Sequence, residues 1–259
     1  MSAKFKKASP RVSAADYFVL QHRLFKRALN AYARKKNNDS LHQLRVAIKK
    51  MNALLILLHK LNPDFDYEAA YVPYKNIFKR AGFIREEILQ SERLKQGSEN
   101  KQGKRVRVAI LSKLNTELFR VSKAELVNAG KALPFIQSAL GKLKQKEIIK
   151  YCEKLFAKVE AKWKNTTRNA EIHKFRKHLK QLLYCSHLLS QKQRDELISS
   201  KKHKRIDKLQ EAIGQWHDNI LLLNKISGEH VKVGSQFLQS IQDETKSMLK
   251  EIHQKGDKL

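Results

Sequence analysis

The sequence predicts an all-α protein made of two pseudo-symmetric four-helix bundles that arose by an internal duplication and form one compact helical domain. Two observations predict this class. Only 9 Gly and 4 Pro interrupt the 259 residues, and the segments between them carry apolar side chains at helical spacing. The same order of helices and polar motifs then recurs after 131 to 132 residues, which is typical of a duplicated helical unit.

Turn and capping residues place four helices in each repeat. In the first repeat, 13–130, we expect helices at Ser13–Lys36, Ser40–Leu61, Glu68–Arg93 and Lys104–Asn128. In the second, 140–255, we expect them at Lys142–Trp163, Arg168–Leu189, Gln193–Ile226 and Gly234–His253. Together they make one helical domain over 13–259, with a basic N-terminal arm at 1–12.

The ends of these helices follow from local signals. Asn37-Asn38-Asp39 ends the first helix, and a capping box, Ser40-x-x-Gln43, begins the second. Asn62-Pro63 stops the second helix, and Pro73 lies within the first turns of the third. Gly97–Gly103 is expected to be a loop, and Ala129-Gly130 is expected to end the fourth helix.

Charge narrows the possible functions. The chain has 54 Lys plus Arg against 25 Asp plus Glu, a formal net charge of +29. Because this excess disfavours a compact state, a polyanion is the expected partner: nucleic acid, an anionic membrane surface or a phosphate polymer. The longest apolar run, 53–58, is too short to span a membrane. Because the N-terminus lacks the apolar segment of a secretory signal, we expect a cytoplasmic protein. Cys152 and Cys185, without metal-ligand spacing, are expected to be buried thiols.

A basic stripe runs along the second helix of each repeat. Each member follows a residue of the apolar seam by one position: His42, Arg45 and Lys49 in the first repeat, and His173, Arg176 and Lys180 in the second. Positions 0, 3 and 7 of a helix lie within about 60° of one another, so each trio forms one stripe about 10 Å long. The third helices repeat as well, as Gly82-x-x-Arg85-Glu86 and Gly214-x-x-His217-Asp218. We expect each glycine to admit a neighbouring backbone.

These motifs resemble the CHAD family, the α-helical domains named for their histidines. The matching segments are HQLRVAIKK at 42–50, AGFIREEIL at 81–89, HKFRKHLKQLLYC at 173–185 and LQEAIGQWHDNI at 209–220, in the order that the family has them. The resemblance implies a helical fold whose basic residues line a central cavity that binds inorganic polyphosphate. The residues it assigns to binding are His42, Arg45, Lys49, Lys50, Arg85, His173, Arg176, Lys177, Lys180 and His217.

This sequence departs from the family pattern at three positions. Gln181 replaces the second cation that Lys50 supplies in the first repeat, which puts symmetric contacts there in doubt. Ala81 stands where the family usually has Leu, and Glu86 where it has Asp. We therefore expect the third helix of the first repeat to pack differently from its counterpart.

The chemistry of these residues suits a phosphate chain, which offers anionic oxygens and no base edges. Arginine supplies bidentate donors, lysine supplies mobile charge, and histidine adds a donor whose charge depends on pH. Glu86 and Asp218 are expected to accept hydrogen bonds from neighbouring cations and orient them. The basic run 201–205 is interpreted as a solvated face that extends the anion site, with Lys202 and His203 as secondary contacts. The other histidines, such as His187, are more simply packing or capping residues.

The same residues bear on several rival functions. No P-loop, HExxH or ExExK motif occurs, so we expect binding without catalysis and without a cofactor. Three histidines surrounded by Arg and Lys disfavour a metal ion. An RNA-binding or DNA-binding helical protein remains the alternative, since the charge suits it equally well. Aromatic residues, 8% of the chain, do not interleave with the basic stripes as stacking platforms would. Association with polyphosphate granules is a further expectation.

Overall fold

A computed structural model describes residues 12–94, 101–163, 169–228 and 233–258, and every regular element within them is a helix. The helices are α1 (Ala14–Lys35), α2 (Asn38–Leu61), α3 (Tyr67–Leu94), α4 (Lys101–Gly141), α5 (Gln145–Trp163), α6 (Asn169–Ser186), α7 (Gln191–Leu197), α8 (Ser200–Gly228) and α9 (Ser235–Gly256). The all-α prediction is confirmed. Residues 1–11 of the expected arm and 97–100 of the expected loop lie outside the described residues, whereas 101–103, also expected in that loop, form the start of α4.

The first four helices pack in a ring, α1 on α2, α2 on α3, α3 on α4 and α4 on α1, which makes the first bundle. Its helices begin and end at side-chain signals. The Ser13 hydroxyl accepts from the backbone N–H of Asp16, and the chain leaves α1 through Lys36 in the left-handed conformation. The cap of α2 is Asn37, whose side chain accepts from the N–H of Ser40. The predicted capping box at Ser40 was therefore wrong by one turn, and Ser40 is buried instead.

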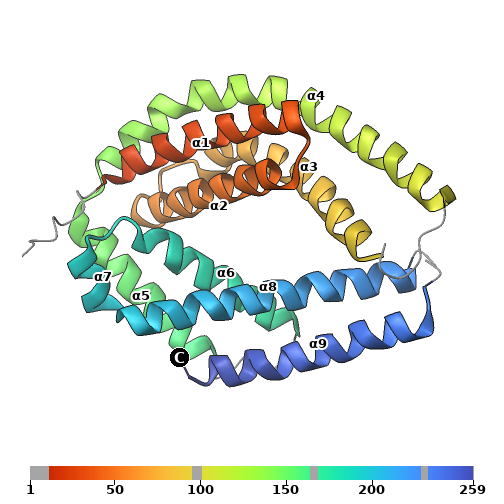
Figure 1. Cartoon of the computed structure of the whole chain (residues 1–259). Coiled ribbons are helices and arrows are strands. Elements are labelled where there is room, and N and C mark those ends of the chain that lie inside the picture. Colours follow the sequence, from red (N-terminus) through yellow and green to blue (C-terminus); the bar gives the residue numbers. More distant parts are fainter. Residues whose placement is uncertain (1–11, 95–100, 164–168, 229–232, 259) are drawn as a thin grey trace, which may run out of the picture.

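Helix α4 differs most from the prediction. Instead of ending at Ala129-Gly130 it continues to Gly141, and the expected boundary at 131–140 is helical, with Pro134 inside. The apolar stripe explains this, because Ala129, Ile136 and Leu140 are all buried at helical spacing on both sides of the proline. A proline removes one backbone hydrogen bond and bends a helix, but buried contacts hold the two parts together. Figure 1 shows α4 arching over the first bundle toward the second.

The second bundle consists of α5, α6, α8 and α9, with the short α7 against α5. The single helix expected over 193–226 is split in two. Ser190 and Gln193 form a capping box that begins α7, and the N–H of Ile198 closes that helix on the carbonyl of Arg194. The Ser199 hydroxyl then accepts from the N–H of Lys202 at the start of α8. Helix α6 ends at Ser186, one turn earlier than expected.

The two bundles share a continuous apolar interior where α2 meets α5 and α6. Buried Cys152, Cys185 and Leu188 from the second bundle belong to the main core of the first. Both cysteines are buried thiols, as expected. Gln181 adds a polar link, since its amide donates to the carbonyl of Ala53 at 2.8 Å. The bundles are thus fixed relative to each other along one side, and α3 and α8 face each other farther along (Figure 1).

Candidate functional site

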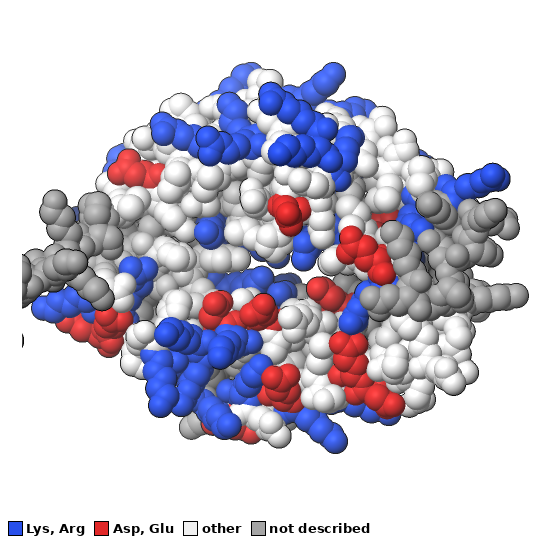
Figure 2. Space-filling model, in the orientation of Figure 1, with Lys and Arg blue, Asp and Glu red and all other residues white. Residues whose placement is uncertain are grey.

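A cavity of about 630 Å³ lies between the bundles, lined by α2 and α3 on one side and by α6 and α8 on the other. Figure 2 shows it as a slot across the middle of one face, with Lys and Arg side chains along its edges. Four helices therefore present the four sequence motifs to one space. This follows from the seam: because each basic residue comes one position after a buried apolar residue, burying the seam turns the basic stripe toward the neighbouring bundle.

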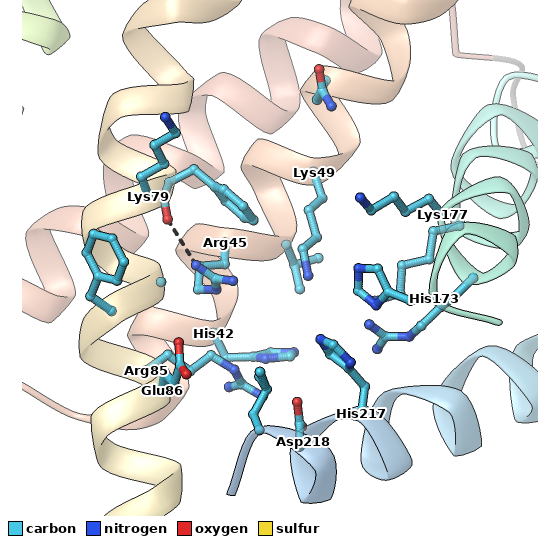
Figure 3. A pocket seen from close by; sticks show the side chains of 18 of the residues that line it. His42, Arg45, Lys49, Lys79, Arg85, Glu86, His173, Lys177, His217 and Asp218 are labelled. Carbon is cyan, nitrogen blue, oxygen red and sulfur yellow. Dashed lines mark hydrogen bonds between the residues drawn. The ribbon is translucent and has the colours of Figure 1, made fainter. Parts of the chain in front are cut away.

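Most of the predicted binding residues line this cavity together (Figure 3). They are His42, Arg45, Lys49, Arg85, His173, Arg176, Lys177, Lys180 and His217, with Glu86 and Asp218 beside them. Lys79 adds a seventh Lys or Arg, so seven basic side chains face two carboxylates. This excess of positive charge in a walled space is suited to holding a polyanion.

One arginine from each bundle is held by a backbone carbonyl and a glycine. Arg45 Nη1 donates to the carbonyl of Phe78 at 2.9 Å, and Arg176 Nε donates to the carbonyl of Gln210 at 2.9 Å. Each carbonyl comes four residues before a glycine, Gly82 or Gly214. A Cβ built on Gly82 would lie 2.7 Å from Arg45 Nη1, and one on Gly214 would overlap the Arg176 guanidinium.

These glycines therefore admit an arginine side chain. The sequence-based expectation of a neighbouring backbone was wrong in this respect. Each arginine uses one of its five N–H donors for the backbone carbonyl. The other four can donate to a ligand. The two halves repeat this contact in the same register.

Burial and neighbouring cations lower the pKa values of two lysines in the cavity. Burial, and then the charge of Lys180 with three arginines behind it, lowers the pKa of Lys49 to about 6. Burial and the charge of Arg176 lower the pKa of Lys180 to about 8, although Asp218 opposes this. At neutral pH Lys49 is thus largely uncharged in the free protein. An anion in the cavity would favour its charged form.

The three histidines lie where the two bundles meet. The rings of His173 and His217 have centroids 4.2 Å apart. Burial and then His217 lower the pKa of His173 to about 4, and its buried Nδ1 has no hydrogen-bond partner among the described residues. Burial also lowers the pKa of His42, with Arg85 as the next cause. All three are neutral donors and acceptors at pH 7 in the free cavity.

The two carboxylates act differently from the prediction. Glu86 accepts from the amide of Gln90 at 3.1 Å, and no hydrogen bond joins Asp218 to a cation among the described residues. Asp218 nevertheless opposes the lowering of the pKa of Arg176, Lys180 and His217. Its influence is therefore electrostatic, and it eases repulsion between cations without fixing their geometry.

Three of the predicted residues, Lys50, Lys202 and His203, are not among those that line the cavity. The charge of Lys50, with those of Arg194 and His203, acts on His187, whose pKa burial lowers to about 4. Lys202 pairs with Glu160 and lies over the ring of Phe156. Gln181, the repeat counterpart of Lys50, lines the cavity and ties α6 to α2, which explains why a cation is not needed there.

Sequence reasoning missed several lining residues. Asn52 and Ile56 continue the spacing of the α2 stripe, so extending that stripe by two steps would have found them. Lys79 has no basic counterpart in the second repeat, where Glu211 stands. Phe78 lies under Arg45, with the guanidinium carbon 4.2 Å from the ring centroid, and Phe83 and Tyr184 also line the cavity. Aromatic rings thus do accompany the basic stripes, contrary to the expectation from sequence.

Within the described residues, no group of three or more His, Cys, Asp or Glu side chains is placed to hold a metal ion. None of the described helices is long and apolar enough to cross a membrane. Fold and cavity together define an all-α protein with a strongly cationic space between two bundles.

The comparisons with known proteins agree with this class. The CHAD domain profile matches residues 20–225, and the chain belongs to the CHAD-domain family. A similar solved structure is the crystal structure of the CHAD domain from the plant Ricinus communis. It has a TM-score of 0.62 and 15% sequence identity, over 97% of this chain and 92% of that chain, which shows a shared fold. No curated protein matches the sequence.

Proposed function

We propose that this chain binds inorganic polyphosphate in the cavity between its bundles and does not cleave it. The observation that carries the proposal is the matched pair of arginines, Arg45 and Arg176, each fixed by a carbonyl and a glycine at the wall of one cationic cavity. A linear polyphosphate presents anionic oxygens along its whole length, and donors on both walls can bind successive phosphates. Lysines and histidines that lack anionic partners would then gain them.

The charge balance supports a polyanion over a small ligand. Seven Lys or Arg side chains against two carboxylates leave the cavity self-repelling when it is empty of anions. Burial is the main cause of the low pKa of Lys49, and the charge of Lys180, the next cause, reflects that repulsion. A ligand with several negative charges relieves it at several positions at once, whereas a single phosphate relieves it at one or two.

RNA is the competing polyanion, and the aromatic residues of the cavity bear on it. A stacking site needs an open ring face. The ring of Phe78 is covered by Arg45 and approached by Lys49, so it serves as a support for cations. Phe83 is 50% exposed and is the candidate platform if RNA is the ligand. Polyphosphate needs no such platform, and the fixed arginines favour it.

A competition experiment distinguishes these ligands. Fluorescently labelled long-chain polyphosphate is bound to the protein at physiological salt and displaced by unlabelled polyphosphate or by RNA of equal total charge. We expect unlabelled polyphosphate to displace it at a much lower concentration of charge than RNA. Equal displacement would contradict the proposal. The polymer recovered after prolonged incubation should keep its length on a gel, because the proposal is of binding without cleavage.

We further infer that binding recruits the protein to polyphosphate granules in the cytoplasm. The basis is the same cavity, since granules present the polymer at high local concentration. A fluorescent fusion should colocalise with granules, and a fusion carrying Arg45→Ala and Arg176→Ala should be diffuse. Identical localisation of the two fusions would contradict this inference.

A further inference from the structure

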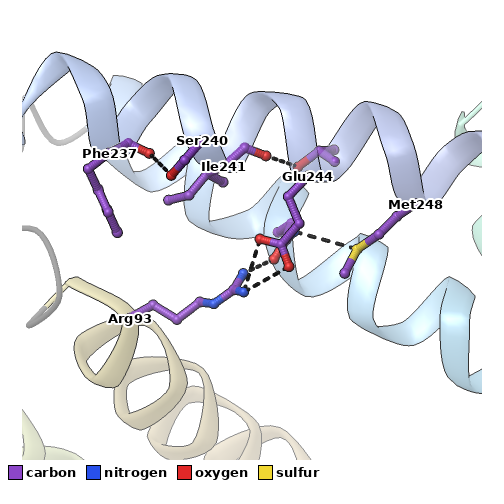
Figure 4. A network of polar contacts seen from close by, with 8 residues as sticks. Arg93, Phe237, Ser240, Ile241, Glu244 and Met248 are labelled. Atoms are coloured by element: carbon purple, nitrogen blue, oxygen red, sulfur yellow. Dashed lines mark hydrogen bonds and ion pairs between the residues drawn. The ribbon is translucent and has the colours of Figure 1, made fainter.

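Beyond the cavity, α3 of the first bundle is joined to α8 and α9 of the second by polar contacts that we call the clasp. The clasp consists of Glu87 and Arg93 on α3, Asn219 and Lys225 on α8, and Glu244 on α9. Lys225 pairs with Glu87 at 2.7 Å, and both side chains are 15% exposed. Arg93 donates to both carboxylate oxygens of Glu244 at 3.1 Å and to the side-chain oxygen of Asn219 (Figure 4).

The clasp continues the two walls of the cavity. On α3 the last lining residue is Gln90, and Arg93 follows three residues later. On α8 the last lining residue is Leu221, and Lys225 follows four residues later. At 1.5 Å per residue both cations lie about one helical turn beyond the cavity, about 4.5–6 Å farther along. A linear polyanion that leaves the cavity in this direction meets Arg93 and Lys225 next.

Separate apolar contacts hold the helices at this end. Leu222, Ile226 and Ile241 form a small buried cluster between α8 and α9, and Leu94 at the end of α3 packs against it. The helices therefore do not depend on the ion pairs alone to stay together. A change of partner by the clasp cations therefore need not separate the helices.

We propose that Arg93 and Lys225 form a second phosphate subsite, which Glu244 and Glu87 occupy until a polyphosphate chain long enough to leave the cavity replaces them. This inference rests on the proposed function. Phosphate oxygens accept the same donors as carboxylates, so the exchange keeps each cation paired. A chain already bound in the cavity presents its next phosphates at high effective concentration, which favours the exchange. A polyphosphate chain that ends inside the cavity cannot reach Arg93 and Lys225. The clasp therefore favours the binding of longer polyphosphate chains.

Two double variants test the subsite, because they should act in opposite directions. Glu87→Gln with Glu244→Gln removes the competing carboxylates, and we expect it to tighten binding of polyphosphate of about 100 phosphates by about threefold to tenfold. Arg93→Gln with Lys225→Gln removes the subsite, and we expect it to weaken that binding by about tenfold. Both should leave the affinity for tripolyphosphate unchanged, since it ends inside the cavity. Affinities are measured by calorimetric titration.

Matched controls remove the effect of net charge. Glu196→Gln with Glu251→Gln changes charge equally at exposed pairs with Lys192 and Lys255. Lys246→Gln with Lys250→Gln is the control for Arg93→Gln with Lys225→Gln, because it removes two positive charges at exposed positions of α9. We expect each clasp variant to change the affinity for long polyphosphate by more than its control does.

Shifts in the same direction for the two clasp variants, or none beyond the controls, overturn the subsite and leave the proposed function standing. If one clasp variant fails to fold, the other decides. If the wild-type protein binds neither long polyphosphate nor tripolyphosphate, the proposed function itself fails, and the subsite with it.

Discussion

The two halves of the cavity repeat one contact and differ in what surrounds it. Arg45 and Arg176 each donate to a carbonyl four residues before a glycine, so both guanidinium groups are anchored at equivalent backbone positions, Arg45 through Nη1 and Arg176 through Nε. The lysines one turn farther along are not equivalent, since the pKa of Lys49 falls to about 6 and that of Lys180 to about 8. The arginines thus provide fixed geometry in both halves, whereas the lysines provide charge whose amount depends on position.

The largest effect is expected from removing both fixed arginines. Arg45→Ala with Arg176→Ala should weaken polyphosphate binding by about 100-fold or more, because a hydrogen bond to a charged group contributes about 1.5–3 kcal/mol. Lys246→Ala with Lys250→Ala removes the same charge from exposed positions of α9 and should cost less than about threefold. Calorimetric titration at one salt concentration checks both variants. Equal losses would mean that diffuse charge, not the arginine pair, holds the polymer.

The glycines test whether geometry matters apart from charge. Gly82→Ala or Gly214→Ala keeps every cation but displaces Arg45 or Arg176, so each should weaken binding by about tenfold, with Gly214→Ala the more severe. Gly130→Ala is the matched control, because nothing lies within 4 Å of a Cβ at that position of α4. Alanine favours a helix over glycine by about 1 kcal/mol, so the control should keep its affinity and gain stability in thermal unfolding. If Gly82→Ala and Gly214→Ala both kept the wild-type affinity, the glycines would have no role in placing the arginines for binding.

The lysines make binding depend on pH. A bound anion raises the pKa of Lys49 from about 6, so binding takes up a proton, and affinity should rise by about fivefold between pH 8 and pH 6. Lys49→Arg stays charged and should flatten most of this rise, whereas Lys180→Arg should flatten mainly the part near pH 8. The sequence pointed to the histidines as the donors whose charge depends on pH, but the pKa of His173, at about 4, places much of its effect at lower pH. Titrations from pH 8 to pH 6 distinguish these groups, and a flat wild-type profile would contradict both assignments.

The smallest effect is expected from Asp218. Its charge offsets the repulsion around Arg176, Lys180 and His217, so Asp218→Asn should lower the melting temperature of the free protein by a few degrees. The same change should tighten polyphosphate binding by about twofold to threefold, because the cavity becomes more positive. Asp243→Asn, at an exposed position of α9, serves as the control. A weaker affinity in Asp218→Asn would instead support an orienting role for this carboxylate.

The repeat in the sequence predicted most of the cavity, because the apolar seam fixes which way its neighbours point. His42, Arg45 and Lys49 and their counterparts meet for that reason. The repeat could not reveal Lys79, whose counterpart is acidic, nor the contact of Gly82 with Arg45, which depends on the approach of two helices. The family resemblance assigned Lys50 to the cavity, but one residue beyond Lys49 the helix has turned by about 100°, and Lys50 lies elsewhere.

The fold was predicted at the level of class and of most helices, but two connections were wrong for physical reasons. At Gly130 and Pro134 the buried stripe through Ile136 outweighs the two helix-breaking residues, and α4 continues. At Ser190 a capping box begins a separate short helix, α7. In both places local signals and burial compete, and sequence periodicity alone does not decide which prevails.

The central claim is that one polyphosphate chain lies between Arg45 and Arg176 and contacts both bundles at once. A crystal structure of the protein with tripolyphosphate tests it most directly. We expect phosphate density inside the cavity, with oxygens within hydrogen-bond distance of both guanidinium groups and of Lys49. Density confined to the outer surface, or touching the arginine of one bundle only, would contradict it.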